Sequence, residues 1–410
     1  MRISLRLLLL TIAMCPALGA QVAVIGDTVY TMKGEPIRDG VVLIQGKTIK
    51  AVGPLASTEL PAGTPIVWAK VVLPGLIDAH TVIGLTGYLN QPHDQEQVET
   101  SAAIQPELRA SDAYNPEDRL VEWVRGLGVT TIHTGHGPLA LVSGQTMVVK
   151  TVGRTVEDAV LKPRAMIAAT LAETGRRGRA RGEAASDKGP GTRAKAVALL
   201  REELVRAAAY AAKTAGADES KRPERNLKLE ALAEVLAGKT PLLVTCQRHQ
   251  DIAAAIRLAK EFKIRLVLDG AADGPDMLEE IKASGFPVIV HPAMQRPGGE
   301  SENLRYTAAA SFVAAGIPTY LQSGFESYVP KTRVVLFEAA VAVANGLGRD
   351  QALRRLTIDA AKFLEIDDRV GSLEVGKDAD LALYDGDPFE YLTHCIGVFI
   401  DGKRVAEGKR

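Results

Sequence analysis

The sequence lacks an excess of charge of either sign. Its 49 Lys and Arg residues balance its 49 Asp and Glu residues, so the formal net charge is +0 and the pI is about 7.1. Proteins that bind nucleic acids usually carry a basic surface, so this balance argues against that function. The composition, 46% hydrophobic and 24% charged over 410 residues, is that of an ordinary globular protein. This length suffices for one large barrel with a small appended domain, or for two or three average domains.

Long apolar runs are missing beyond the N-terminus. The first twenty residues place Arg2 and Arg6 before a short apolar run and end in small residues from Ala17 to Ala20. This pattern is typical of a secretory signal peptide, and its apolar run is shorter than the roughly 20 residues that a membrane-spanning helix needs. We therefore predict that residues 1–20 are removed on export. The mature protein is expected to be soluble, without a membrane span, and periplasmic or extracellular.

Cysteine is scarce, with three residues in the chain. Removal of the first twenty residues leaves Cys246 and Cys395, which form a disulfide only if the fold brings them close together. The sequence does not give this distance, and we interpret both as buried thiols. Phosphate-binding loops are missing as well. The glycine-rich "GHGPLALVSGQ", which begins at Gly135, has neither the GxxxxGK[ST] nor the GxGxxG spacing.

Buried strands and amphipathic helices alternate through the middle of the chain. Four apolar segments, "PLLVTC", "IRLVLDG", "PVIVHP" and "PTYLQS", begin at residues 241, 264, 287 and 318. Helical patterns separate them, the clearest being "DIAAAIRLAKEF" from Asp251, whose apolar residues follow the i, i+3, i+4, i+7 spacing. This alternation predicts βαβ units with a parallel sheet, to which "LIDAH" and "VTTIHT" would add earlier strands. The units lack self-similar sequence, which excludes a repeat protein.

Both ends of the chain consist of short β segments punctuated by Gly and Pro. N-terminal examples are "VAVIGDTVYT" and "GVVLIQGKTIKAVG", and the C-terminus has the same texture in "GKDADLALYDG" and "IGVFIDGKRVAEG". We predict one small β domain built from both ends. The predicted boundaries are residues 21–70 and 369–410 for its two parts and residues 71–368 for the middle domain.

Three groups of residues stand out: "VVLPGLIDAHT" after the first β segments, "DRVGSLEVGKDADLALYDGDPFE" with the later "VFIDGKRV", and a central stretch from "QPELRASDAYNPEDRL" to "LALVSGQTMVVKTVGRT". They resemble the amidohydrolase superfamily, whose metal-dependent barrel enzymes include imidazolonepropionase-like proteins, and the central stretch is similar to one exported subgroup of it. The resemblance covers nearly the whole chain after residue 20. It implies a TIM-like (β/α)8 barrel with a small composite β-sandwich domain formed by both termini. It also implies hydrolysis of C–N or C–O bonds in amides, cyclic amides or peptides.

Active members of this superfamily hold Zn²⁺ or a similar divalent ion at the ends of several barrel strands. The resemblance implies a His-x-His on the first strand, later histidines, a Glu or carboxylated Lys, and a late Asp, which together activate a bound water. This sequence keeps His80, and Glu173 fits a position where the subgroup has Glu. The other ligand positions fall on residues that coordinate metal poorly, namely Val82, Thr245, Gln247, Gly270 and Gly324. Because a catalytic zinc needs about three protein ligands, we predict a degenerate site without a tightly bound metal.

Four histidines lie at or just after predicted strand ends, where barrel enzymes carry their catalytic residues. They are His80, His133, His136 and His291, with Asp269 or Glu173 as a carboxylate partner. A single histidine in such a place is more often a hydrogen-bonded structural residue than a catalytic one. Together these residues are candidates for a catalytic site that the family does not use. The sequence also places three further residues, outside such a site: His249 at the surface, Cys246 as a small buried residue, and Lys150 as a structural or solvent-facing lysine.

Two functions follow from this pattern. In the first, the chain is an exported amidohydrolase-like protein that has lost most of its metal ligands and is catalytically impaired. It then binds a small-molecule ligand or pairs with an active relative. In the second, it is a working amidohydrolase whose site for Zn²⁺ or another divalent ion is reduced or relocated. The replaced ligands favour the first function, whereas the intact strand and loop framework supports the second. The sequence leaves the substrate and the oligomeric state open.

Overall fold

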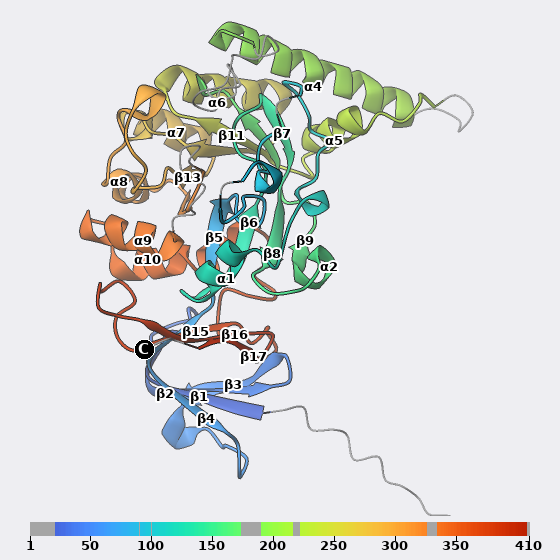
Figure 1. Ribbon diagram of the computed structural model, residues 1–410. Coiled ribbons are helices and arrows are strands. Elements are labelled where there is room, and N and C mark those ends of the chain that lie inside the picture. The colour runs from blue at the N-terminus through green and yellow to red at the C-terminus, as the bar shows by residue number, and fades with distance from the viewer. Residues whose placement is uncertain are drawn as a thin grey trace, which may run out of the picture.

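The structure, a computed structural model, describes residues 21–89, 91–99, 101–173, 190–215, 222–325 and 334–407. The predicted signal peptide, residues 1–20, lies outside these ranges. Within them, helices surround a ring of strands, and a separate sheet lies at one end of the ring (Figure 1). No helix in these ranges is long and apolar enough to cross a membrane.

Within the described ranges, strands from both ends of the chain form one seven-stranded sheet, which we call the terminal sheet. Its order is β17-β16-β15-β4-β1-β2-β3. The strands are β1 (Gln21–Val29), β2 (Ile37–Gln45), β3 (Thr48–Pro54), β4 (Ile66–Pro74), β15 (Leu381–Tyr384), β16 (Cys395–Ile400) and β17 (Lys403–Glu407). Strand β4 continues past residue 70 because the first turn signal after Ile66 is Pro74-Gly75. Residues 71–74, which the sequence assigned to the middle domain, therefore belong to this sheet.

One short segment connects opposite sides of the terminal sheet. Ala379 N–H donates to the Lys47 carbonyl in the β2–β3 turn at 2.8 Å. In turn, Gly402 N–H in the β16–β17 turn donates to the Ala379 carbonyl at 3.0 Å. Strands β2 and β16 lie far apart in the strand order, so these bonds show that the sheet folds over on itself.

The middle of the chain supplies the strands of the ring. They are β5 (Leu76–Thr81), β6 (Val129–Thr134), β7 (Val142–Gln145), β8 (Met147–Lys150), β9 (Val160–Lys162), β10 (Ile167–Thr170), β11 (Leu242–Cys246), β12 (Leu266–Gly270), β13 (Val288–Val290) and β14 (Thr319–Tyr320). Two hydrogen-bonded sheets result, in the orders β14-β13-β12-β11-β10-β7 and β5-β6-β8-β9. Strands β10 to β14 run parallel to one another, and β5 runs parallel to β6.

The two sheets meet at two seams and so make a TIM-barrel-like ring. At the first seam, Thr146 alone separates β7 from β8, so one extended segment pairs with β10 at its start and with β6 at its end. At the second seam, Ala79 N–H donates to the Leu321 carbonyl and Gly324 N–H donates to the His80 carbonyl, both at 3.1 Å.

The ring departs from an all-parallel (β/α)8 barrel at one place. Strands β7 and β8 run antiparallel to their neighbours β10 and β6. A parallel crossover needs a dozen or more residues. Strand β6 ends at Thr134 and β7 already begins at Val142, so the chain has room only to turn back directly.

An apolar cluster fills the interior of the ring and unites its two sheets. Its strand residues are buried and include Ile77, Val148, Leu243, Val267 and Ile289. Burying side chains of this size contributes about 1.5–3 kcal/mol each. Helix α11 (Ile358–Phe363) adds residues to the same cluster and contacts β5 at the end where that strand begins. The interior is therefore packed at this end, and the carboxyl ends of the strands lie at the other.

Helices cover the outside of the ring (Figure 1). Besides α11 they are α1 (Arg119–Arg125), α2 (Val156–Ala159), α4 (Arg193–Ala215), α5 (Leu227–Leu236), α6 (His249–Phe262), α7 (Leu278–Ser284), α8 (Ala308–Ala314), α9 (Val335–Ala344) and α10 (Arg349–Arg355). Short 3-10 turns lie at Leu55–Ser57, Pro92–Asp94, Ala110–Asp112, Gly274–Asp276 and Gly299–Ser301. The predicted helix at "DIAAAIRLAKEF" is α6, and its predicted apolar face is the buried one.

A buried lysine joins the ring to the terminal sheet. Lys150 ends β8, and only 4% of its side chain is exposed. Its ammonium group lies 2.8 Å from Asp378 and 2.9 Å from Asp380, and it also contacts Asp401. Burial alone would lower the pKa of Lys150, but the nearby carboxylates raise it, so the lysine stays charged. Lys150 is therefore a structural residue and not a solvent-facing one, which were the two roles predicted for it from the sequence.

Candidate functional site

Strand ends place a histidine and an aspartate side by side inside the ring. His80 comes from the end of β5 and Asp269 from the end of β12, and both are buried. The Nδ1 atom of His80 lies 3.4 Å from Oδ1 of Asp269. The carboxylate of Asp269 also accepts hydrogen bonds from the Thr245 hydroxyl at 2.6 Å and the Gln322 amide at 2.7 Å. We call these four residues the His80–Asp269 cluster.

The two titratable groups of the cluster stabilise each other's charge. Burial alone would lower the pKa of His80, but the carboxylate of Asp269 raises it above its ordinary value. Burial alone would raise the pKa of Asp269, but His80 and the two hydrogen bonds lower it. Each group therefore favours the charged form of the other.

A second buried carboxyl group lies two residues before His80. Asp78 accepts hydrogen bonds from the backbone N–H groups of Ser323 at 3.0 Å and His80 at 3.3 Å. Burial raises the pKa of Asp78 from 3.8 to about 7, although these hydrogen bonds and His80 act in the opposite direction. Asp78 was not among the candidates predicted from the sequence, yet its pKa of about 7 makes it a carboxyl group of the site that titrates near neutral pH.

His133 packs against His80 but is held by other partners. Its ring lies 5.6 Å from the His80 ring, centroid to centroid. One ring nitrogen contacts the Ala79 carbonyl at 2.7 Å and the other contacts the Thr146 hydroxyl at 2.6 Å. Burial and the neighbouring His80 lower the pKa of His133 from 6.5 to about 3, so its ring is neutral. His133 thus connects β5 to the seam at Thr146.

The two remaining histidine candidates are also buried. His291 follows β13 and borders a small cavity of about 10 Å³ that it shares with Gln322. Its Nδ1 atom lies 3.3 Å from the Pro292 carbonyl, and burial lowers its pKa to about 4. Burial likewise lowers the pKa of His136. Both pKa shifts favour the neutral ring, in the opposite direction to the shift of His80.

The positions where the resemblance implies metal ligands lie around the same strand ends, and they are Val82, Thr245, Gln247, Gly270 and Gly324. Two of them, Gly270 and Gly324, have backbone conformations that favour glycine, because φ is +86° at Gly270 and +69° at Gly324. A Cβ atom at Gly270 would lie 2.5 Å from the Gln247 side chain, and one at Gly324 would lie 2.5 Å from Pro292. A ligand side chain at either position would therefore be strained by the backbone conformation, whatever the space around it.

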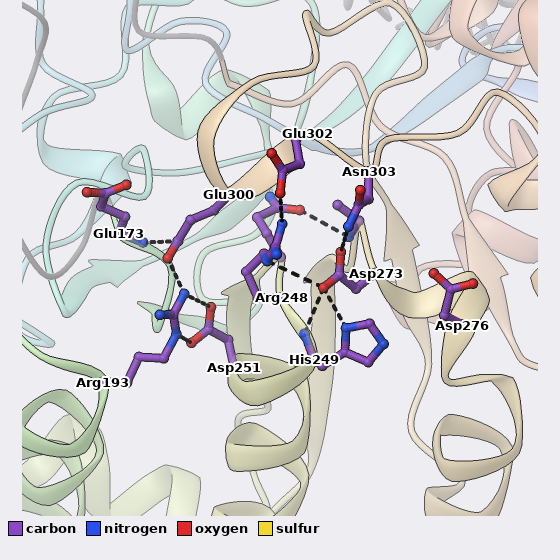
Figure 2. A network of polar contacts seen from close by, with 12 residues as sticks. Glu173, Arg193, Arg248, His249, Asp251, Asp273, Asp276, Glu300, Glu302 and Asn303 are labelled. Carbon is purple, nitrogen blue, oxygen red and sulfur yellow. Dashed lines mark hydrogen bonds and ion pairs between the residues drawn. The ribbon is translucent and has the colours of Figure 1, made fainter.

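Charged residues at the carboxyl ends of the neighbouring strands pair with one another (Figure 2). We call this group the mouth network, and it consists of Glu173, Arg193, Arg248, His249, Asp251, Asp273, Glu300, Glu302 and Asn303. Asp273 accepts hydrogen bonds from His249 Nδ1 at 2.6 Å and from the Asn303 amide at 2.8 Å. The side chain of His249 is half exposed, as predicted. The network thereby ties together the loops that follow β11, β12 and β13.

Glu173, a predicted metal ligand, belongs to the mouth network. Its backbone N–H donates to the Glu300 carboxylate, which also pairs with Arg193. Arg193 in turn donates to Asp251 at 2.8 Å. Figure 2 shows Glu173 beside Glu300, at the edge of the network, so the structure groups it with these residues and does not add it to the His80–Asp269 cluster.

The residues at the strand ends do not fit a resident divalent ion. Among the residues that the structure describes, no group of three or more His, Cys, Asp or Glu side chains is placed to hold a metal. A catalytic zinc needs about three protein ligands and an open position. The cluster supplies two side chains of ligand type, His80 and Asp269, and they face each other. This arrangement can hold a proton and orient a hydrogen-bonding group, but it has too few donors for an ion.

Both cysteines of the described chain are buried and free, which confirms their interpretation as thiols. Burial raises the pKa of Cys246 well above its ordinary 9.0, and Asp269 adds to this shift. The thiolate, which is the reactive form, is therefore not populated at neutral pH. Cys246 lies next to the cluster in the chain without being a nucleophile.

Known proteins share the sequence pattern and the fold. The sequence profile of the Amidohydrolase family matches residues 304–405. An imidazolonepropionase of Solibacter usitatus is 24% identical over 391 residues, 88% of each chain. "Amidohydrolase tasK" of Hapsidospora irregularis is 25% identical over 398 residues, 88% of this chain, but the chain spans only 39% of that protein's length. The solved structure of an amidohydrolase from Thermotoga maritima MSB8 is 28% identical, with a TM-score of 0.86 over 94% of this chain and 100% of the other.

Proposed function

Because the chain belongs to the amidohydrolase superfamily, we propose that it is a catalytically impaired member that works by binding. As an enzyme it would hydrolyse C–N bonds, the reaction class of the superfamily. The His80–Asp269 cluster carries the proposal, since Asp269 faces His80 at 3.4 Å and accepts hydrogen bonds from Thr245 and Gln322 where relatives hold a metal. The bound species would be a small molecule or an active relative.

The charge of the cluster is the physical reason for impaired catalysis. Zinc-bound water has a pKa near 7, whereas free water has a pKa of 15.7. Without an ion, hydrolysis needs a strong base to take a proton from water. The carboxylate of Asp269 raises the pKa of His80 and so favours its protonated form. A protonated imidazole cannot accept a proton from water, so this shift works against His80 as the base.

One observation favours a second candidate function, a working hydrolase with a reduced or relocated site. A protonated imidazole can donate its proton to a leaving group, and a carboxyl group that titrates near pH 7 can take one up. His80 and Asp78 have these properties. The two candidate functions differ in whether the purified protein turns over amides.

We expect the purified mature protein to carry less than one equivalent of Zn²⁺, Mn²⁺ or Fe²⁺ and to show negligible hydrolysis of amide and dipeptide substrates. A metal ion held by His80 and a single further group exchanges readily, because two ligands are fewer than a stable site has. Elemental analysis of protein purified without chelator, before and after dialysis, measures the metal. Val82→His serves as a gain-of-ligand control and should restore neither metal nor turnover, since Gly270 and Gly324 still supply no ligand side chain.

Two other results would contradict the proposed binding function. Stoichiometric metal that survives dialysis, together with hydrolysis that His80→Ala abolishes, would overturn the binding function and support the working hydrolase. Hydrolysis that persists in metal-free protein and is lost in His80→Ala would support the reduced site instead.

We also propose that residues 1–20 are removed on export, and that residues 21–74 and 369–410 form one β domain beside a barrel domain in the middle of the chain. The arginines before the short apolar run support the first proposal. The terminal sheet supports the second. Identification of the N-terminal residue of the secreted protein tests the first proposal, and an intact Met1 in that fraction would contradict it.

A further inference from the structure

Part of the loop between β13 and α8 is fastened to the neighbouring strand ends of the ring, and we call this part, residues 298–307, the strap. Its side chains reach the loops that follow β11 and β12 and the start of α4 (Figure 2). Four polar contacts hold it, namely Glu300 with Arg193, Glu302 with Arg248 at 2.6 Å, Asn303 with Asp273 at 2.8 Å and Arg305 with Asp276 at 2.5 Å. The strap therefore spans several strand ends at the mouth of the ring.

The strap also closes one side of the His80–Asp269 cluster. The backbone N–H of Arg305 donates to His291 Nε2 at 3.4 Å. Arg305 borders the cavity of about 10 Å³ that His291 shares with Gln322, and Gln322 in turn donates to Asp269. A cavity of this size holds about one water molecule. All four side chains of the cluster are buried, so a ligand reaches them only if a covering segment moves.

Polar contacts, and not apolar packing, keep the strap in place. None of residues 298–307, all of which the structure describes, is buried. Segments with few buried apolar contacts open at a small part of the free energy of global unfolding. The chain just before the strap is anchored, because Met294 N–H donates to the buried Glu338 carboxylate at 3.0 Å. Gly299 follows with a φ of +56°, and such a residue at the start of the strap suits a hinge.

We propose that the strap is a gate that opens to admit a small-molecule ligand to the His80–Asp269 cluster, and that its ion pairs determine how often it opens. Two of these pairs are accessible to salt, because Glu302 is 58% exposed and Arg305 and Asp276 are 43% and 42% exposed. Salt weakens exposed pairs of this kind. An opening under a short segment suits a small molecule and not a whole protein. The inference rests on the proposed function for what enters, whereas the opening itself is measured without a ligand.

His291 is a reporter of the open strap. The strap covers this residue directly, and burial lowers its pKa, which favours the neutral ring that reacts with diethyl pyrocarbonate. Its rate of modification, followed by mass spectrometry of the peptides, therefore measures how often the strap opens. We expect this rate to rise at least about threefold between about 0.1 and 1 M NaCl, since the Debye length falls from about 10 Å to about 3 Å. His133, which is buried and held by Ala79 and Thr146, should stay unmodified at both salt concentrations.

A double variant tests the ion pairs themselves. Glu302→Gln with Asp276→Asn removes two exposed pairs of the strap and should raise the rate at low salt at least about threefold, with a smaller response to added salt. Glu261→Gln is the matched control. It breaks a pair with Arg201 at 2.9 Å, in which both side chains are 42% exposed, between helices α4 and α6, and should keep the wild-type rate.

Two results would overturn the gate. One is a His291 rate that responds neither to salt nor to the double variant. The other is modification of His133 in parallel with His291, because the opening would then be global unfolding. The expected response supports the gate even in a protein that hydrolyses amides, a result that would contradict the proposed binding function alone.

Discussion

Lys150→Met is expected to destabilise the protein by about 3–5 kcal/mol, the usual cost of breaking a buried ion pair from one side. The methionine side chain fills similar space but leaves Asp378, Asp380 and Asp401 without their shared counter-charge. Because these carboxylates belong to the terminal sheet and its preceding loop, the variant loosens the connection between that sheet and the ring. Urea unfolding followed by circular dichroism measures the effect as a lower midpoint.

Lys47→Met is the control for this variant. Lys47 lies 3.6 Å from the same Asp401, but its side chain is 74% exposed, so its loss should cost less than about 1 kcal/mol. The loss of folding stability in Lys150→Met should also increase as the pH rises. Burial already raises the pKa of Asp380 to about 6 against the pull of Lys150, and removal of the lysine raises it further. A raised carboxyl pKa means stability that is present below pH 3.8 and lost as the pH rises through the folded pKa. Equal midpoints for both variants would refute the structural role of Lys150.

Asp269→Asn is expected to cost about 3–5 kcal/mol as well, because it leaves the buried His80 without its counter-charge. The amide keeps the shape of the side chain, so the change tests charge more than packing. In the variant the pKa of His80 should fall, since Asp78 and Gln322 alone then oppose the effect of burial. Histidine NMR signals recorded against pH measure this directly. An unchanged His80 titration would contradict the charged pair.

An exposed pair provides the matched control. His394 and Asp385 are also 3.4 Å apart, but their side chains are 69% and 42% exposed, so Asp385→Asn should cost less than about 1 kcal/mol. The pH range in which the buried pair stabilises the protein follows from the pKa shifts of His80 and Asp269. The contribution of His80 is full below pH 6.5 and is lost as the pH rises through its raised pKa. The contribution of Asp269 is full above pH 3.8 and is lost as the pH falls through its lowered pKa. Both are present between pH 3.8 and 6.5, where the variant should differ most from the wild type.

Much of the ring could be predicted because its strands are apolar runs that end in turn signals. "PLLVTC" and "IRLVLDG" became β11 and β12 at the expected places. The antiparallel segment at β7 and β8 could not be predicted, because "LVSGQ" reads as a glycine-rich loop and its pairing depends on the short distance from β6. Likewise, the boundary at residue 70 ignored the absence of a turn signal before Pro74.

The candidate site was predicted in its location but not in its contacts. The position at the ends of β5 and β12 follows from strand direction alone, which placed His80 and Asp269 at one mouth. Their partner Gln322 was missed, although its place two residues after β14 is the signal that would have found it. Glu173 was predicted to be a metal ligand because of the family resemblance. Its actual neighbour is Glu300, which lies in a loop whose position no strand pattern predicts.

Because the terminal sheet combines strands from the N-terminal and C-terminal parts of the chain, it can be completed only late in synthesis. Strand β4 ends at Pro74, and its partner β15 begins at Leu381, so about 300 residues must leave the ribosome in between. At about 5–20 residues per second this takes roughly 15–60 s, during which one edge of β4 has no strand to pair with. The ring, by contrast, has all its strands once Gly324 has emerged. The first strands to be translated are therefore among the last to be completed, and the nascent chain depends on protection of that open edge until its C-terminus is released.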